Sequence, residues 1–351
     1  MIDSRQVGQA ALLTAGAPLD HVIWELPVLV LLPHSRCNCR CLMCDIWKIR
    51  QIREITQEDL EPHLDSLRQL KVQWLVLSGG EPLLHSSLPA LCHGLRSEGI
   101  RITLLTSGLL LGPRAGMIVR NFDDVIVSLD GPAEVHNRIR GIPKAFEKIG
   151  AGIKALRGLR RDIPIQGRCT VQKENCTSLR ETVNAARDLT LNSISFLAVD
   201  ITSQAFNRPE GWPLDRQADM RLAPGDIERL EQEIELLIRE MGHSISAGFI
   251  VETPEKLRRI PRHFRALLGE IQPMAPLCNA PWVSAVINSD GSVQPCFFHL
   301  PIGNLREQPL ISILNGRKAM EFRQRLDIPN DPICQRCVCS LFIPPAEMAR
   351  D

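Results

Sequence analysis

The sequence contains no tyrosine, and aromatic residues make up only 4% of its 351 positions. No tyrosine can therefore serve as a hydrogen donor or a radical relay. The chain also carries almost no net charge, because 41 Lys and Arg residues against 40 Asp and Glu residues leave +1. This balance gives no support to the binding of nucleic acid or of a membrane surface.

Long apolar runs are absent as well. The longest uninterrupted run, residues 28–32, is far shorter than the roughly 20 residues that span a bilayer. The first residues do not have the basic and then apolar layout of a signal peptide. We therefore expect a soluble, cytoplasmic protein without a membrane span. In that reducing compartment, clustered cysteines bind metal or perform redox chemistry more often than they form disulfides.

Cysteine, by contrast, is abundant, and nine of the 12 cysteines fall in two clusters. The first cluster lies within eight residues: Cys37, Cys39, Cys41 and Cys44. The second lies toward the C-terminus: Cys278, Cys296, Cys334, Cys337 and Cys339. The remaining three are isolated and are interpreted as small, buried hydrophobic residues: Cys92, Cys169 and Cys176.

Short apolar runs of strand length alternate with helical patterns over residues 25–200. Strands are predicted at 27–32, 72–77, 102–106, 125–129, 163–171 and 193–199. Helices are predicted at 57–70 (with Thr56 as the N-cap), 87–98, 143–156 and 179–189. This alternation favours a parallel sheet covered by helices. Six units are too few for a closed eight-stranded barrel, so the sequence predicts an α/β fold with a partial (β/α)6 TIM-like barrel.

The pattern changes after Asp200. A loop is predicted at 202–223, followed by an acidic helix at 226–241, a basic helix at 255–268, a hairpin at 282–287 and 292–298, and a helix at 311–326. We therefore divide the chain into an N-terminal extension (1–24), a barrel core (25–200), a linker with helices that shape the substrate pocket (201–275), a small cluster-binding domain made of a β-hairpin and a helix (276–342) and a tail (343–351).

The first cysteine cluster follows the first predicted strand, at the C-terminal mouth of the sheet, where α/β proteins place their active sites. Read as C-x3-C-x2-C, Cys37, Cys41 and Cys44 offer three thiolates from one short loop. On a cubane iron–sulfur cluster, three thiolates leave one iron without a protein ligand. The spacing alone leaves two alternatives open: a small zinc site, and a fully ligated cluster that also uses Cys39.

Three further motifs follow in register with the predicted strands. Ser78-Gly79-Gly80-Glu81-Pro82 follows the second strand, Thr106-Ser107-Gly108 follows the third, and Val127-Ser128-Leu129-Asp130-Gly131 lies on the fourth. With these motifs and C-x3-C-x2-C, the chain resembles the radical S-adenosylmethionine (radical SAM) superfamily over most of residues 25–200. The resemblance implies a [4Fe-4S] cluster on Cys37, Cys41 and Cys44 that binds S-adenosylmethionine.

The same resemblance implies contacts to S-adenosylmethionine. Gly79 and Gly80 lack side chains, so a ligand can approach the backbone closely. With Glu81 and Pro82 they match the motif that holds the methionyl amino group. Further contacts are expected from the strand ends and neighbouring loops: Met43, Ser107, Ser128, Asp130 and Arg168. Arg168 is a candidate partner for the carboxylate, and Arg140 competes for that role.

Two positions depart from the family pattern. Met43 replaces a residue that is often aromatic, and it can pack near the adenine but cannot stack on it. Ser107 replaces a common asparagine. Cys39 lies between the ligand positions and is expected to point away from them.

The C-terminal cysteines resemble the auxiliary-cluster extension of the same superfamily, which has a long form called SPASM and a short form called twitch. The long form holds two extra clusters and needs at least seven cysteines, whereas five follow residue 270. The short form fits, with one auxiliary [4Fe-4S] cluster on four cysteines: Cys278, Cys296, Cys334 and Cys337. Cys339 is a spare or alternate ligand. A structural zinc site with four cysteine ligands is the alternative.

The resemblance implies a radical SAM enzyme. A flavodoxin- or ferredoxin-like donor reduces the first cluster, S-adenosylmethionine is cleaved to a 5′-deoxyadenosyl radical, and that radical abstracts hydrogen from a substrate carbon. An auxiliary cluster able to accept an electron favours oxidation or cross-linking of a small molecule or peptide. No residue is assigned as catalytic. The competing class is a non-catalytic scaffold or binding protein stabilised by zinc or iron–sulfur.

Two further features bear on the substrate. Only 36 residues precede Cys37, too few for the N-terminal peptide-binding domain that many peptide-modifying members carry. The basic segment 258–265 has two interpretations: it attracts an anionic substrate or a redox partner, or it is a solvated helix face.

Overall fold

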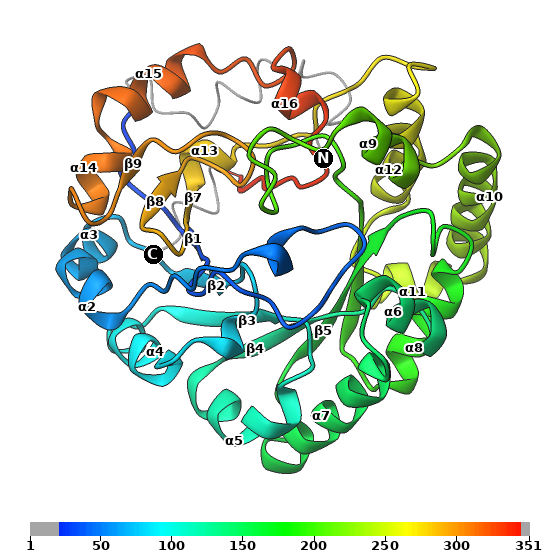
Figure 1. Ribbon diagram of the computed structural model, residues 1–351, viewed down its shortest axis with the longest axis horizontal. Helices are drawn as coiled ribbons and strands as arrows, with labels where there is room; N and C mark the ends of the chain where they lie inside the picture. The colour runs from blue at the N-terminus through cyan, green and yellow to red at the C-terminus, as the bar shows by residue number, and fades with distance from the viewer. Residues whose placement is uncertain (1–20, 345–351) are drawn as a thin grey trace.

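The computed structural model describes residues 21–344, with a curved sheet at its centre and helices on the outer side (Figure 1). Six parallel strands form the core: β1 (Val28–Leu31), β2 (Trp74–Leu77), β3 (Arg101–Thr106), β4 (Asp124–Ser128), β5 (Ile165–Val171) and β6 (Ser193–Ala198). Each of these strands pairs with the next one along the chain. The predicted α/β fold with a partial (β/α)6 barrel is confirmed.

Helices cover the outer face of the strands and bury their apolar side chains. These are α4 (Leu88–Ser97), α5 (Leu111–Asn121), α6 (Ala133–Arg140), α7 (Ala145–Leu159) and α8 (Leu179–Asp188). The main core runs through both layers, and Leu75 and Leu104 of the sheet and Ile149 of α7 are all fully buried. Nowhere in residues 21–344 is there a helix both long and apolar enough to cross a bilayer.

The helix predicted at 57–70 is instead three short elements. These are α2 (Gln57–Leu60), η2 (Glu61–His63) and α3 (Leu64–Gln69). Pro62 explains the break, because proline has no N–H to continue the helical hydrogen bonds. The predicted N-cap is confirmed: the Thr56 side chain accepts from the Asp59 backbone N–H, and the Asp59 carboxylate accepts from the Thr56 N–H in return.

Helices after the barrel core close the open side beside β6. They are α9 (Leu214–Met220), α10 (Pro224–Glu240), α11 (Gly242–Ser246) and α12 (Pro254–Leu267). α9 interrupts what the sequence predicts to be a loop at 202–223. α12 packs against both α10 and β6, and Ile250 forms a parallel bridge with Ile194 at the sheet edge.

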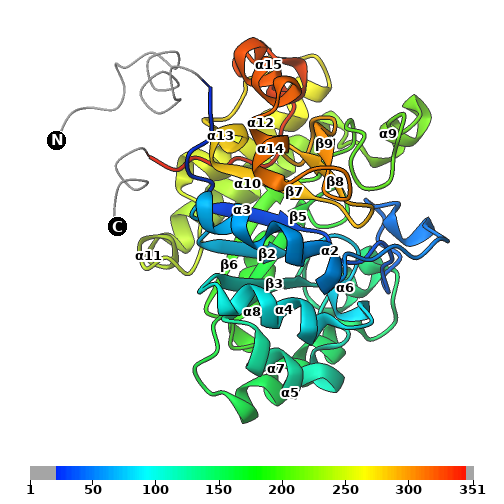
Figure 2. The ribbon, with the colours of Figure 1, turned by 90° about the vertical axis from the view of Figure 1, so that its left-hand side faces the viewer.

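The C-terminal elements extend the barrel sheet. The predicted hairpin is present as β7 (Ser284–Ile287) and β8 (Ser292–Gln294), and a short β9 (Gly303–Asn304) pairs with β8. β7 also pairs in parallel with β1, so the hairpin continues the same sheet, which the sequence pattern does not predict. Figure 2 shows α14 (Leu310–Leu314) and α15 (Arg317–Arg325) at the opposite side of the molecule from α5 and α7.

Three boundaries in this region differ from prediction. Residues 282–283 belong to α13 (Ala280–Val283) rather than to the first strand of the hairpin. β8 ends at Gln294, so Cys296 lies after the strand and not on it. The helix predicted at 311–326 is divided into α14 and α15. Gly316 lies at the break, where an added Cβ would come too close to the Ser312 carbonyl oxygen. A short α16 (Pro332–Gln335) precedes the last cysteines.

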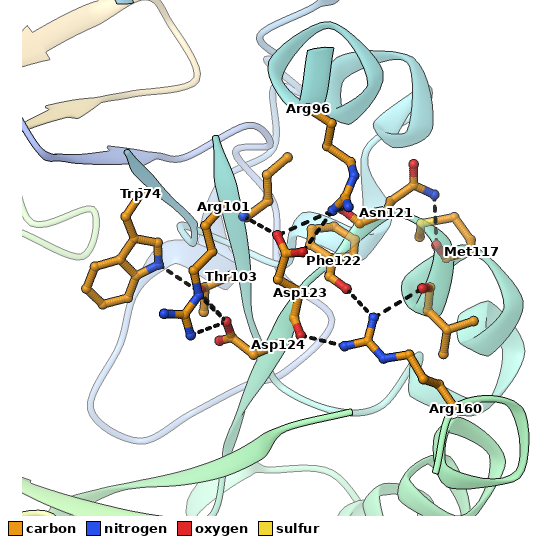
Figure 3. Close-up of polar contacts among 12 residues, drawn as sticks. Trp74, Arg96, Arg101, Thr103, Met117, Asn121, Phe122, Asp123, Asp124 and Arg160 are labelled. Carbon is orange, nitrogen blue, oxygen red and sulfur yellow. Dashed lines mark hydrogen bonds and ion pairs between the residues drawn. The ribbon is translucent and has the colours of Figure 1, made fainter. Parts of the chain in front are cut away.

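Ion pairs and hydrogen bonds close the N-terminal end of the barrel (Figure 3). The Asp123 carboxylate accepts from the Ile102 N–H at 2.7 Å, and Arg160 donates to the Asp123 carbonyl at 2.6 Å. The buried Asp124 carboxylate accepts from Arg101 at 2.6 Å. Because this end of a TIM-type barrel lies opposite the active-site mouth, we assign these contacts to stability.

Candidate functional site

The loop after β1 carries the first four cysteines in a half-buried position. Cys41 is buried, and Cys37 and Cys44 are half-buried. Cys39 is only 2% exposed, and the thiols of Cys37 and Cys41 beside it raise its pKa. The expectation that Cys39 points away is therefore not met. The loop therefore brings the thiols of residues 37, 39 and 41 together.

The C-terminal end of α6 supports this loop through backbone contacts. The Arg40 N–H donates to the Arg140 carbonyl at 2.9 Å, and the Leu42 N–H donates to the Ile139 carbonyl at 3.0 Å. Gly141 caps α6 with a φ of +63°, and an added Cβ would lie 2.6 Å from the Arg40 carbonyl oxygen. The end of α6 therefore fixes the backbone between Cys39 and Cys44.

A buried ion pair connects β4 to the cysteine loop. Arg140 donates to Asp130 Oδ2 at 2.6 Å, and its Nη1 lies 3.7 Å from the Cys41 sulfur. Burial alone would lower the pKa of Arg140, but the neighbouring carboxylate of Asp130 raises it. Arg140 therefore stays charged beside Cys41, where its charge stabilises a thiolate.

A second support comes from the segment between β6 and α9. Arg208 is buried, donates to the Met43 carbonyl at 2.5 Å, and pairs with Asp200 at 3.2 Å. Its guanidinium lies 3.7 Å from the centre of the Trp212 ring. The Trp212 indole N–H donates to the Asp45 carboxylate at 2.7 Å. The cysteine loop is thus held from both sides, by α6 and by residues 200–216.

The Gly-Gly-Glu-Pro loop packs directly on the cysteine loop. Gly79 has a φ of +109°, and an added Cβ would lie 2.8 Å from that of Leu32. At Gly80 an added Cβ would lie 2.1 Å from the Arg36 carbonyl oxygen. No other residue type fits either position without moving the loop, because the two backbones are in contact.

Glu81 anchors this loop from within. It is fully buried and accepts from the Leu83 N–H at 3.1 Å, the Thr106 hydroxyl at 2.8 Å and the Ser107 N–H at 2.8 Å. Burial raises the pKa of Glu81, and these donors oppose that effect. The Ser107 hydroxyl also lies 2.6 Å from Glu81 and 3.0 Å from Asn38 of the cysteine loop. Three loops therefore meet at this carboxylate.

The other residues predicted to contact S-adenosylmethionine lie around the same mouth but differ in exposure. Met43 is buried, and the side-chain amide nitrogen of Gln172 lies 3.6 Å from the Met43 sulfur. Asp130 is fully buried, and its second carboxylate oxygen accepts from the Thr170 N–H at 3.0 Å. Both Asp130 oxygens thus have protein donors, and the geometry gives this residue a positioning role through Arg140.

Arg168 and Ser128 lie opposite each other in adjacent strands. Ser128 ends β4 and is half-buried, whereas Arg168 is exposed and donates to the Ser195 hydroxyl at 3.3 Å. Arg168 lines a small cleft of about 190 Å³ together with Cys339 and Glu252. Of the two arginines that compete for a carboxylate ligand, Arg140 is occupied by Asp130 and Arg168 is accessible.

The C-terminal cysteines converge from three separate segments. Burial raises the pKa of Cys296 to about 11, with Cys278 and Cys339 contributing. Burial also raises the pKa of Cys337, and its neighbours Cys339, Cys278 and Cys296 add to the effect. The pKa of Cys334 is raised in the same way, by burial and by Asp331, with smaller contributions from Cys296 and Cys278. Cys278 therefore lies within electrostatic reach of the other four thiols, and this set suits an iron–sulfur cluster.

A histidine and an aspartate adjoin one of these thiols. His299 Nε2 lies 3.6 Å from the Cys334 sulfur and 3.8 Å from Asp331 Oδ1. These donor atoms all lie within 4.8 Å of one another, which is close enough to hold a single ion. No sequence pattern points to His299, because 35 residues separate it from Cys334 along the chain.

Sequence reasoning also missed the residues that hold the cysteine loop from outside the barrel. Arg208, Trp212 and Arg216 lie in a segment predicted only as a loop, yet Arg216 donates to the Leu42 carbonyl at 2.9 Å. The available signal was an arginine and tryptophan cluster in a Pro- and Gly-rich stretch. Because their partners lie more than 160 residues away, no local pattern could pair them.

Comparison with known proteins gives the family. The model of the radical SAM superfamily matches residues 31–186, and that of an iron–sulfur cluster-binding domain, SPASM, matches residues 278–338. The chain belongs to the radical SAM superfamily and is a catalytic, S-adenosylmethionine-dependent iron–sulfur protein. Within the superfamily it is a member with a C-terminal SPASM domain. This domain confirms the kind of site expected in the tail, an auxiliary iron–sulfur site.

Relatives with related chemistry cover most of the chain. An AdoMet-dependent heme synthase of Methanosarcina barkeri is 27% identical over 83% of this chain and 81% of that protein. A PqqA peptide cyclase of Xanthomonas euvesicatoria is 24% identical over 89% of this chain and 80% of that protein. Both relatives are named as enzymes, one for heme synthesis and one for cyclisation of a peptide.

A solved structure supports the fold. SuiB of Streptococcus suis, bound to S-adenosylmethionine, superposes with a TM-score of 0.62 at 13% identity. The match covers 92% of this chain and 74% of SuiB. At this identity the likeness concerns the fold, and it includes both the barrel and the C-terminal elements.

Proposed function

We propose that Cys37, Cys41 and Cys44 hold the [4Fe-4S] cluster of this enzyme, and that the loop Gly79–Pro82 binds S-adenosylmethionine beside it. The observation that carries the proposal is the backbone contact between Gly80 and Arg36, which fixes the two loops against each other. Bound together, the cluster and S-adenosylmethionine supply a 5′-deoxyadenosyl radical that abstracts hydrogen from a substrate carbon.

The residues of this chain have distinct roles in the proposal. Gly79 and Gly80 let their loop pack closely against the cysteine loop, and Glu81 holds their loop in place. Arg140, charged and bonded to Asp130, stabilises the Cys41 thiolate. Met43, Ser107, Ser128 and Arg168 remain proposed contacts to S-adenosylmethionine, and Arg168 is the accessible cation for its carboxylate.

We assign the second iron–sulfur site to Cys278, Cys296, Cys334 and Cys337, with a single cluster. Convergence of these thiols from three segments supports the assignment, and Cys339 and His299 are the alternate ligands nearest to them. We further propose the division into a core (25–200), a pocket segment (201–275) and a cluster domain (276–342). A flavodoxin- or ferredoxin-like electron donor and a cytoplasmic location complete the proposal.

Anaerobic reconstitution tests the ligand assignment. Wild-type protein is expected to hold about eight irons per chain, since each of two cubanes holds four. With dithionite and S-adenosylmethionine it should release 5′-deoxyadenosine. Cys41→Ala should lose this activity at least 100-fold and about half of the iron, whereas Cys92→Ala, a solitary buried thiol, should keep both.

Two further variants sharpen the result. Cys39→Ala should retain iron and activity, because Cys39 is not among the three proposed ligands. Cys334→Ala with Cys337→Ala should lose product formation but still cleave S-adenosylmethionine. Full activity in Cys41→Ala, or zinc without iron in the wild type, would contradict the proposal.

A further inference from the structure

A large cleft lies between α9, α12, the segment 269–274 and α16. Its volume is about 690 Å³, and it reaches Cys337 of the C-terminal cysteines. This volume falls within the range of small-molecule sites in proteins.

Four arginines line this cleft: Arg221, Arg259, Arg262 and Arg336. None of the lining residues in the part of the chain that the structure describes is acidic. Within residues 21–344, none of the four has an ion pair with Asp or Glu. Arg259 and Arg262 are also three residues apart on one helix, where like charges repel. We call this feature the arginine cleft.

The rest of α12 provides an internal comparison. Arg258 pairs with Glu235 of α10 at 2.6 Å, and Arg265 pairs with Glu231 at 2.7 Å. The basic segment 258–265 therefore has two faces. Neither of the two interpretations drawn from the sequence describes the whole segment. The face toward α10 is neutralised by ion pairs, and the face toward the cleft is left for an anion from outside the chain.

Apolar side chains share the cleft with the arginines. Leu214 is 82% exposed and Met274 is 55% exposed, although both lie in a concave surface. Ile271 and Leu267 add further apolar surface. A ligand with an apolar body would cover them, and exposed apolar patches of this kind mark binding sites.

The arginines are dispersed over three elements, since Arg221 follows α9, Arg336 follows α16, and the other two lie on α12. Several separate carboxylates on one molecule could engage arginines that come from different elements. Arginine binds carboxylates through two parallel N–H bonds, so each group contributes both affinity and orientation.

The arginine cleft adjoins a second, smaller cleft. It shares Arg259, His263 and Cys337 with the smaller cleft that contains Arg168 and Ser195 of β5 and β6. His263 Nε2 is buried in this shared wall, and the described residues provide no hydrogen-bond partner for it. A ligand in the arginine cleft would therefore lie against Cys337 and the wall that the two clefts share.

We propose that the arginine cleft binds the substrate of this enzyme, and that the substrate is a small organic molecule with two or more separate carboxylates on an apolar body. The inference rests on the proposed function for its reaction, but the binding itself does not. Arg259 and Arg262 hold the carboxylates, and Leu214 and Met274 contact the apolar body.

Binding of coproporphyrin III to the reconstituted enzyme tests the proposal. This probe carries four dispersed carboxylates on an apolar ring, and quenching of tryptophan fluorescence reports its binding. Arg259→Gln with Arg262→Gln should weaken binding at least tenfold. Arg258→Gln with Arg265→Gln, on the same helix but outside the cleft, should change it less than twofold.

Binding of three further compounds determines which class of ligand the arginine cleft takes. The tetramethyl ester of the probe, which keeps the ring and loses the charges, should bind at least tenfold more weakly. Farnesyl diphosphate and a hexaglutamate peptide should also bind more weakly than coproporphyrin III. Equal binding of acid and ester, equal effects of the two double variants, or preference for the diphosphate or the peptide would each overturn the proposal.

Failure of this proposal can be distinguished from failure of the proposed function. Release of 5′-deoxyadenosine with dithionite and no substrate should be unchanged in Arg258→Gln with Arg265→Gln, because both side chains pair with α10 outside the cleft and the cysteine loop. Loss of probe specificity with this activity intact would refute the cleft alone. Loss of this activity in the wild type would refute the proposed function instead.

Discussion

At the residue scale, several polar side chains of the site act on other protein groups. Glu81 and Asp130 are both fully buried, and each accepts hydrogen bonds at both carboxylate oxygens from the protein. Their effect on the cofactor site is indirect, through the Gly-Gly loop and through Arg140. Arg168 makes no ion pair among the described residues, although Glu252 lines the same cleft, and it is exposed where we propose a ligand contact.

His136 gives a prediction at this scale. Burial lowers the pKa of His136 to about 4, from the 6.5 expected when the chain unfolds. Between these values the unfolded chain takes up a proton that the folded protein does not. The free energy of unfolding should therefore fall as pH drops from about 6.5 to 4, by up to about 1.4 kcal/mol per pH unit from this group.

The matched variant is His136→Gln, whose amide can still accept from the Asp130 N–H as His136 Nδ1 does. Its thermal midpoint should fall less steeply than that of the wild type over the same pH window. Anaerobic thermal unfolding at pH 7.5, 6.5, 5.5 and 4.5 measures the difference. Parallel pH profiles of the two proteins would refute a neutral, buried His136.

At the scale of elements, the cysteine loop depends on its neighbours more than on its own sequence. The end of α6 binds its backbone on one side, and residues 200–216 bind it on the other. An iron–sulfur loop with three ligands needs this support, because one corner of its cluster has no protein ligand to hold it.

Arg208→Ala tests this support. The substitution removes the bond to the Met43 carbonyl and leaves the buried Asp200 carboxylate unpaired, which destabilises proteins by roughly 3–5 kcal/mol. Iron should be lost in air several times faster than from the wild type. Arg229→Ala, which breaks only a surface ion pair with Asp226, is the control and should match the wild type. Equal rates of iron loss in all three proteins would show that the segment does not support the loop.

At the scale of the whole molecule, the C-terminal domain is part of the barrel. β7 pairs with β1 over four residues, from Val28 with Ser284 to Leu31 with Ile287. A small separate core of Trp282, Val283 and Ile328 lies beyond this junction. The strand that precedes the cysteine loop is therefore covered on both edges, by β2 and by β7.

A chain ending at residue 275 should therefore fold poorly. Without β7, the apolar β1 becomes an open sheet edge, which promotes aggregation. We expect this truncated chain to aggregate or to melt at least 10 °C lower by circular dichroism. Full-length Cys334→Ala with Cys337→Ala keeps β7 and should retain the fold. A monomeric truncated chain with the wild-type midpoint would show that the core folds alone.

Local patterns predicted much of the fold because they act over a few residues. The β-branched runs identified all six core strands, and Thr56 and its Asp59 partner fixed a helix start. Boundaries failed where single residues intervene, as at Pro62 and Gly316. The C-x3-C-x2-C spacing and the Gly-Gly-Glu-Pro motif identified the family, since each places its chemistry on one continuous segment.

The sequence by itself determined the barrel class, the two groups of thiols and the radical SAM family, because periodicity and motif spacing are properties of neighbouring residues. Only the tertiary structure decided that β7 joins β1, that Arg208 and Trp212 hold the cysteine loop, and that Arg221, Arg259, Arg262 and Arg336 share one cleft. Pairings across a hundred or more residues leave no mark on local patterns, because the free energy that selects them comes from burial and charge in the assembled fold.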